Sequence, residues 1–212
     1  MVIDHIIWDW NGTLLDDTGI VVASMNVLLQ RRALPLLDPV RYREIFDFPV
    51  QAYYEAAGFD LAREPFAVLA EEWIAEFEAR WPAASVHADA LVAIEALTGH
   101  GLTHSILSAA EQQLLLRQVR HFGIEAHFSD IIGIDDHHAV SKVDHGRRWL
   151  ERTTLGLDNV LLVGDTAHDV EVARSLGIAV VLIADGHQSR PRLLATGAPV
   201  LNSAAALPGF VR

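Results

Sequence analysis

From residue 85 onward the sequence alternates between short apolar runs and helical stretches, and this alternation restricts the fold more than any other feature. The periodicity predicts strands at 102–107, 128–134, 160–163, 178–184 and 199–202, and helices at 90–97, 111–121, 142–154 and 167–176. Glycine follows or closes most of these helices. Such repetition is typical of a mostly parallel sheet with helices on both faces. We therefore expect an α/β fold.

One more strand is predicted at the N-terminus, and it ends in a carboxylate. The apolar run at 3–8 is followed by Asp9, and then by the turn-forming residues Asn11, Gly12 and Thr13. Open α/β sheets place their chemistry at the carboxyl ends of strands. A Gly-Thr turn also offers backbone amides and a hydroxyl group to an anion. This loop is therefore the first candidate site.

Residues 16–84 have helical periodicity and no strand signal. Apolar spacing predicts helices at 18–32, 42–48 and 51–57, and a longer helix that starts near Pro65 and ends near Trp81. We expect two domains: an α/β core formed by 1–15 and 85–212, and a helical domain, 16–84, inserted after the first strand.

Composition excludes several classes of protein. The formal net charge is −12, which argues against a protein that binds the nucleic-acid backbone. The longest apolar runs are strand-length, far short of a membrane span, so no membrane partner is expected. Cysteine is absent and no signal peptide is recognisable, which favours a cytoplasmic location. An anionic ligand would have to be held by a local positive charge or a bound cation.

Chemistry-bearing residues occur at four places, each at or just beyond a predicted strand end or at a helix start. They are Asp9, Ser108, Lys142 and the segment 164–169. Lys142 is the single lysine among 16 basic residues. Because parallel strands bring their carboxyl ends to one edge, we expect all four places to converge.

Converging residues of these types would form a phosphate-processing site. Asp9, Asp165 and the carbonyl oxygen of Asn11 supply hard ligands for Mg²⁺, and Asp169 lies four residues beyond Asp165. Taken one at a time, these residues have simpler interpretations: Ser108 as a helix cap, and Lys142 as a solvated side chain. Their order along the chain carries the prediction.

Four segments resemble the four motifs of the haloacid dehalogenase-like (HAD) hydrolases. They are DWNGTLLDD at 9–17, ILSAA at 106–110, Ser141-Lys142, and VGDTAHD at 163–169. The resemblance covers nearly the whole chain and implies a Rossmann-like core with a helical cap inserted after the first motif. The chain is similar in this respect to the phosphoglycolate phosphatase and β-phosphoglucomutase branch.

The resemblance also implies roles for individual residues. Asp9 would be the nucleophile and a magnesium ligand, and Lys142 a catalytic residue of the third motif. Asp165 and Asp169 would form the acidic metal-binding motif. The hydroxyl of Ser108, the amide of Ala109 and the turn at Gly12 and Thr13 would bind the phosphate of a small phosphorylated substrate.

Asn11 departs from the family pattern. Phosphatases of this family usually carry aspartate two residues after the nucleophile, where it protonates the leaving group and then activates water. Asn11 has no titratable proton. Turnover would then be slow, or would need a good leaving group or a substitute residue, for which His137, His138 and His168 are candidates.

Several functions remain open at this point. We favour a magnesium-dependent phosphatase that forms an aspartyl-phosphate on Asp9. The alternatives are a catalytically impaired protein that binds a phosphorylated ligand or regulates a partner, and a 2-haloacid dehalogenase, which the acidic fourth motif disfavours. We set aside a phosphonate hydrolase, which would need a lysine in the cap, because the only lysine is Lys142, outside the cap. We also disfavour a phosphomutase, because its reaction depends even more on the acid that Asn11 replaces.

Substrate specificity is expected to lie in the inserted helices. Residues 16–84 contain 12 acidic residues and six arginines, so any anion contact there must come from an arginine. Arg43 and Tyr53 are the candidate substrate-binding residues, in an aromatic stretch whose rings could equally pack between helices. The segment from Gly186 onward is expected to carry no chemistry. The oligomeric state is open.

Overall fold

A six-stranded, all-parallel sheet forms the centre of the protein. The computed structural model describes residues 2–134 and 142–211. The strand order is β5-β4-β1-β6-β7-β8, and every neighbouring pair is parallel. This confirms the predicted α/β, Rossmann-like fold. The strands are β1 (His5–Trp8), β4 (Thr103–Glu111), β5 (Asp130–Ile134), β6 (Val160–Gly164), β7 (Ala179–Ile183) and β8 (Val200–Leu201).

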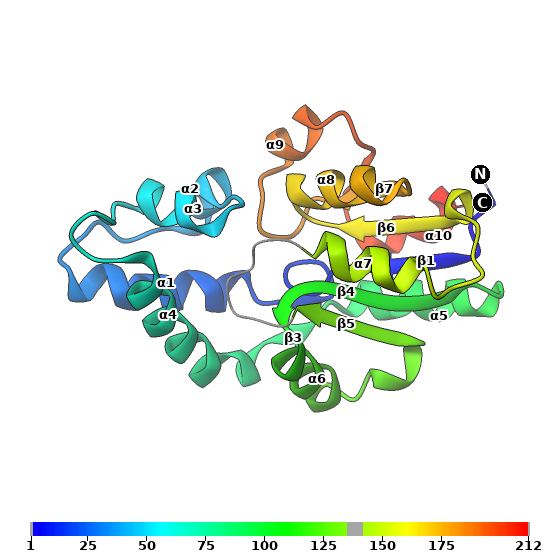
Figure 1. The fold of residues 1–212 in the computed structure, drawn as a ribbon, viewed down its shortest axis with the longest axis horizontal. Helices are drawn as coiled ribbons and strands as arrows, with labels where there is room; N and C mark the ends of the chain where they lie inside the picture. The colour runs from blue at the N-terminus through cyan, green and yellow to red at the C-terminus, as the bar shows by residue number, and fades with distance from the viewer. Residues whose placement is uncertain (1, 135–141, 212) are drawn as a thin grey trace.

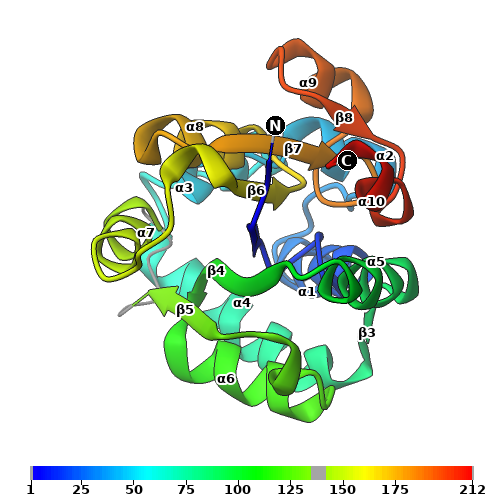
Figure 2. The ribbon, with the colours of Figure 1, turned by 90° about the vertical axis from the view of Figure 1, so that its right-hand side faces the viewer.

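Helices cover both faces of the sheet because successive strand residues point to opposite sides. Ile6 and Trp8 of β1 pack with α5, α6 and α10, while Ile7 packs with α7 and α8. Figure 2 shows these two groups on opposite sides of the sheet. The helices are α5 (Ala88–Gly99), α6 (Gln112–His121), α7 (Val143–Leu150), α8 (Ala167–Leu176), α9 (Arg190–Ala195) and α10 (Leu207–Phe210). Short 3₁₀ turns lie at Trp81–Ala83, Glu125–His127, Leu157–Asn159 and Ala204–Ala206.

Four helices between the first strand and the rest of the sheet form a second hydrophobic cluster, which also includes Leu114 of the core. They are α1 (Thr18–Arg31), α2 (Pro39–Ile45), α3 (Val50–Ala57) and α4 (Phe66–Arg80), and we call them the cap helices. A two-stranded antiparallel ribbon, β2 (Leu15–Asp16) with β3 (Ser85–Val86), joins them to the core. The sequence did not predict this ribbon. The domain boundaries stay a prediction, which this packing supports.

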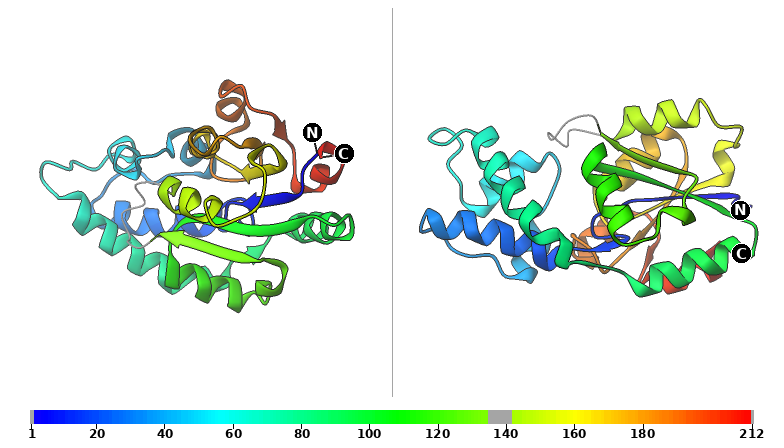
Figure 3. Two further views of the ribbon diagram at one scale, coloured as in Figure 1. Left: turned by 45° about the vertical axis from the view of Figure 1, so that its right-hand side comes forward. Right: turned by 90° about the horizontal axis from the view of Figure 1, so that it is seen from below.

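The cap helices lie beyond the carboxyl ends of the strands. Figure 1 shows the strand arrows directed toward them, with both chain termini at the opposite end of the sheet. The two further views in Figure 3 show the same separation. Within 2–134 and 142–211, no helix has the length and apolar character needed to cross a membrane. The fold therefore places the predicted chemistry between the sheet edge and the cap helices.

Two strand residues of the sheet, His5 of β1 and His104 of β4, are buried histidines. His5 has its ring nitrogens 2.7 Å from Thr103 Oγ1 and 2.8 Å from Ser105 Oγ, and Trp8 Nε1 donates to His104 Nδ1 at 3.1 Å. Burial lowers the pKa of His5 to about 4, and burial together with the neighbouring His5 lowers the pKa of His104 to about 4. Both rings are therefore neutral in the native protein well below neutral pH.

Acidification is expected to destabilise the fold through these two histidines. Their ordinary pKa is 6.5, so between pH 6.5 and pH 4 the unfolded chain takes up protons that the native chain does not. The contribution of each histidine to the free energy of unfolding should fall by about 2 kcal/mol between pH 7 and pH 5. Asp9 and Asp165, whose pKa values burial raises to about 7 and about 6, change the free energy of unfolding in the opposite direction over this range. Urea unfolding at both pH values measures it. Between pH 7 and pH 5, His5→Gln should lose about 2 kcal/mol less stability than the wild-type protein, whereas the same change at the exposed His121 should match the wild-type protein. The same difference between the two pH values in all three proteins would contradict this account.

Candidate active site

Lys142 is the centre of the site. It directly precedes α7, and its side chain is 2% exposed. Its Nζ donates to Asp9 Oδ1 at 2.6 Å, to Asp169 Oδ1 at 2.8 Å and to the carbonyl oxygen of Leu107 at 3.2 Å. The three protons of the ammonium group are thus matched by three acceptors from three parts of the chain. The solvated-lysine interpretation does not apply.

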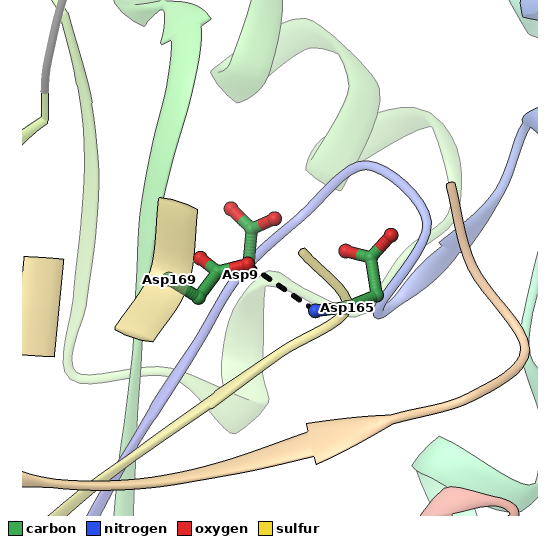
Figure 4. A group of neighbouring side chains, drawn as sticks. All are labelled: Asp9, Asp165 and Asp169. Carbon is green, nitrogen blue, oxygen red and sulfur yellow. Dashed lines mark hydrogen bonds between the residues drawn. The ribbon is translucent and has the colours of Figure 1, made fainter. Parts of the chain in front are cut away.

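Three carboxylates lie together here, and two of them, Asp9 and Asp169, bind the Lys142 ammonium group. Oxygen atoms of Asp9, Asp165 and Asp169 lie within 4.8 Å of one another. Figure 4 shows Asp9 beyond the end of β1, with Asp165 and Asp169 on the segment that leads from β6 into α8. Asp169 Oδ2 accepts from the N–H groups of Asp165 at 3.2 Å and of Thr166 at 3.0 Å. The fourth motif therefore caps α8 and orients an acid at the same time.

Crowding perturbs the ionisation of these acids. Burial raises the pKa of Asp9 to about 7, with Lys142 opposing and the other two carboxylates adding to the shift. Burial likewise raises the pKa of Asp165 to about 6. Burial also acts to raise the pKa of Asp169, but Lys142, the hydroxyl of Thr166 and His168 together lower it, and the net shift is downward. Each carboxylate destabilises the ionised form of its neighbours.

A hard divalent cation fits this arrangement. All the donor atoms are carboxylate oxygens, which favours Mg²⁺, Ca²⁺ or Mn²⁺ over softer metals. Three ionised carboxylates against one ammonium leave two negative charges, and a divalent cation balances them.

The loop after Asp9 holds Asp165 in place. Gly12 has φ +75°, and a Cβ atom there would collide with the carboxylate of Asp165 and the ring of His187. Thr13 Oγ1 donates to Asp165 Oδ1 at 2.8 Å. Gly12 and Thr13 are not among the residues that line the cavity above Asp9. Their predicted role in substrate binding stays a prediction, and the geometry favours a supporting role.

Ser108 and Ala109 lie beside Asp9 and Lys142 in the cavity wall. Strand β4 runs to Glu111, four residues further than predicted, with an irregular register between Leu107 and Glu111. Ser108 Oγ accepts from the N–H of Ala110 at 3.0 Å, and α6 is capped by Glu111 instead. The helix-cap interpretation of Ser108 is therefore wrong. Its phosphate-binding role stays a prediction.

Asn11 is held by a buried carboxylate that the sequence analysis did not single out. Its Nδ2 donates to Asp17 Oδ2 at 2.6 Å, and the N–H of Gly12 donates to Asp17 Oδ1 at 3.0 Å. Asp17 is fully buried. Asn11 and Asp17 both line the cavity above Asp9, so these hydrogen bonds fix the amide group at the cavity wall.

His187 corrects the expectation that the segment from Gly186 onward carries no chemistry. Its backbone N–H donates to Asp165 Oδ2 at 2.6 Å. In its ring, Nε2 lies 3.2 Å from Asp17 Oδ1, and Nδ1 lies 2.8 Å from Tyr42 Oη. Burial acts to lower the pKa of His187, but the carboxylates of Asp17, Asp165 and Asp9 together raise it to about 9. The available signal was its position a few residues after a predicted strand.

The remaining candidates differ in where they lie. Tyr53 and His168 line the cavity, and Phe48 stacks on His168 with ring centroids 4.5 Å apart. Arg43 does not line it, because its Nε donates to the carbonyl oxygen of Gly186 at 2.8 Å. The geometry gives no support to Arg43 as a substrate contact. His137, His138 and Ser141 lie outside the described residues.

Comparisons with known proteins agree with this site. The family model for haloacid dehalogenase-like hydrolases matches residues 6–183. Among curated proteins, the chain is 28% identical to the tyrosine-protein kinase PtkA of Mycobacterium tuberculosis, over 95% of this chain and 69% of that protein. It is 25% identical to a phosphoglycolate phosphatase of Rhodobacter capsulatus, over 97% and 95% of the two chains.

A solved structure shows the same fold. A haloacid dehalogenase-like family protein from Streptococcus pneumoniae superposes with a TM-score of 0.85 at 18% identity, and 99% of each chain is covered. Together with the family match, this confirms the resemblance predicted from the four motifs. The chain belongs to the haloacid dehalogenase-like hydrolases.

Proposed function

We propose that the protein is a magnesium-dependent phosphatase that hydrolyses a small phosphorylated substrate through an aspartyl-phosphate on Asp9. The observation that supports it is the Lys142 ammonium group bound to both Asp9 and Asp169, with Asp165 alongside and Ser108 in the same cavity wall. A relative named phosphoglycolate phosphatase also supports it.

Each residue has a defined task in this proposal. An Asp9 carboxylate oxygen attacks phosphorus, and the bond from phosphorus to the leaving oxygen breaks; water then releases phosphate and regenerates the carboxylate. Ser108 and the amide of Ala109 bind phosphate oxygens, and Lys142 offsets their charge. Asp9, Asp165 and the carbonyl of Asn11 would hold Mg²⁺, with Asp169 beside them. That ion supplies charge neutralisation between carboxylate and phosphate.

Asn11 supports the second candidate, an impaired enzyme that mainly binds its ligand. Its amide has no acidic proton, although it lines the cavity, and its hydrogen bond to Asp17 holds it in place. The curated relative named tyrosine-protein kinase also indicates that phosphoryl chemistry in similar chains is not confined to hydrolysis. The cytoplasmic location and the absence of nucleic-acid and membrane partners stay predictions.

Acetyl phosphate tests the proposed function. Its leaving group needs little protonation, so the wild-type protein should hydrolyse it with Mg²⁺ and lose that activity in EDTA. Mass spectrometry should detect phosphate on Asp9. A protein that binds acetyl phosphate but releases no phosphate under any metal condition would be the binding protein of the second candidate.

Asn11→Asp tests the missing acid. A carboxyl group there would protonate a poor leaving group, so hydrolysis of an alkyl phosphate should rise by about 10²-fold, at the low end of acid–base contributions. Steady-state rates with Mg²⁺ measure this. Asn202→Asp, the same change at an exposed residue, should have no effect. No gain in Asn11→Asp, with metal binding intact, would show that proton supply does not limit the reaction.

A further inference from the structure

The cavity above Lys142 and Asp9 is walled by aromatic and aliphatic side chains of the cap helices and the segments that join them. It has a volume of about 190 Å³, below the range of about 300–1,000 Å³ common for ligand pockets, so it suits a small molecule. On the cap side its wall includes Phe46, Phe48, Tyr53, Trp73, Ile74 and Phe77. The part of the substrate that extends beyond the phosphate would therefore meet an apolar surface.

All six arginines between residues 16 and 84, a range that the structure describes throughout, lie outside this wall. Arg31, Arg32 and Arg80 pair with Glu64, Glu72 and Glu76. Arg43 donates to a backbone carbonyl, and Arg41 and Arg63 are exposed. The cap helices therefore offer no cation to a substrate that carries a carboxylate or a second phosphate.

The cations at the base of the cavity are already matched by acids. Lys142 binds Asp9 and Asp169, His187 lies against Asp17, and His168 Nδ1 lies 3.2 Å from Glu171 Oε2. A second anionic group on the substrate would have to leave water without a compensating charge, which costs about 2 kcal/mol or more. The site thus selects against substrates that carry a second anionic group besides the phosphate.

Ring geometry in the wall suits a flat aromatic group. Phe46 and Tyr53 pack at 70° with centroids 5.4 Å apart, and Trp73 and Phe77 stack at 13° and 5.0 Å. An aromatic ring of a bound substrate could make the same edge-to-face or stacked contacts with these side chains. The hydroxyl of Tyr53 and the indole N–H of Trp73 have no hydrogen-bond partner among the described residues, and both are neutral donors.

We propose that the substrate is the phosphate monoester of a phenol whose aromatic part carries no charged group besides the phosphate. This rests on the proposed function and adds the substrate class. Asn11 leads to the same class independently, because a phenol has a pKa near 10, far below that of an aliphatic alcohol at roughly 16, and leaves without an acid. The Asp9 oxygen–phosphorus bond forms, and the phosphorus–aryl oxygen bond breaks with its electron pair on the phenolate, which takes a proton from water.

Four phosphates test this proposal with the full-length protein and Mg²⁺. Phenyl phosphate should give a kcat/KM about 100-fold above both 2-phosphoglycolate and hexyl phosphate, the first comparison testing charge and the second the leaving group. Acetyl phosphate serves as the reference. If acetyl phosphate is cleaved while phenyl phosphate is no better than 2-phosphoglycolate, the substrate class is wrong and the proposed function stands. If none is cleaved, the proposed function fails and this inference with it.

A matched pair of variants on α4 tests the apolar wall directly. Ala70 lines the cavity, whereas Ala67, one turn earlier on the same helix, is exposed and does not. Ala70→Arg should lower kcat/KM for phenyl phosphate by about tenfold and raise it for 2-phosphoglycolate by about tenfold. Ala67→Arg should change neither. Should Ala70→Arg fail to fold, Val50→Arg introduces a cation in the same wall from α3. An unchanged substrate preference in the folded variant would overturn the proposal.

Discussion

Asp9→Asn is expected to abolish turnover of every phosphate ester, by about 10⁴-fold or more, because the carboxamide oxygen is too weak a nucleophile to form the acyl phosphate. The change is isosteric, and the amide oxygen can still accept from Lys142 Nζ, which Asp9 binds at 2.6 Å. Acetyl phosphate hydrolysis and mass-spectrometric detection of the phosphorylated chain measure the loss. Asp16→Asn, at an exposed residue of β2, is the matched control and should retain both signals.

The same variant should be more stable than the wild-type protein when no divalent cation is present. Burial raises the pKa of Asp9 to about 7, so between its ordinary value of 3.8 and pH 7 the native chain holds a proton that the unfolded chain releases. Stability is lost as the pH rises through that window. A neutral amide removes this loss, and the thermal midpoint at pH 7.5 should rise by a few degrees, about 2–8 °C. An inactive variant with a lowered midpoint would instead indicate damage to the fold.

Lys142→Met is expected to have the largest combined effect on activity and stability. It leaves Asp9 and Asp169 buried without their counter-ion, which costs about 3–5 kcal/mol in comparable buried pairs. Loss of the positive charge beside the phosphate should lower kcat by about 10³-fold. Urea unfolding and acetyl phosphate hydrolysis measure the two effects.

Two comparisons make the Lys142 result specific. Arg117→Met removes an exposed ion pair with Glu78 and should cost less than about 1 kcal/mol. Mg²⁺ should stabilise Lys142→Met more than it stabilises the wild-type protein, because the cation then offsets carboxylates that have no other partner. If Mg²⁺ stabilised both proteins equally, the three carboxylates would not be the cation site.

Parts of the site that lie at strand ends were predictable from the sequence. Asp9, Ser108 and Asp165 come at or just after the ends of apolar runs, Lys142 starts a predicted helix, and parallel strands bring such positions to one edge. The single lysine also falls where the family motif requires one. The exact end of β4 was not predictable, because its last four residues include an irregularity in the ladder with β5 rather than a regular apolar pattern.

The residues that the sequence analysis missed depend on contacts between distant segments. Asp17 accepts a hydrogen bond from Asn11, and the ring of His187 lies against Asp17. The same ring contacts Tyr42, which is 145 residues away in the sequence. Arg43 was a candidate anion contact because of its charge, but its Nε is used to tie α2 to the backbone at Gly186. No local pattern encodes these pairings.

The sequence by itself determined the parallel sheet, the family and the set of reacting groups, because strand periodicity and motif spacing are local properties of the chain. Only the tertiary structure decided what surrounds those groups: that Asn11 is turned toward Asp17, and that the wall above Asp9 is aromatic and carries no arginine of the cap helices. Helical periodicity shows which residues share a face. Which face meets the cavity depends on how the helices pack against one another and against the sheet edge.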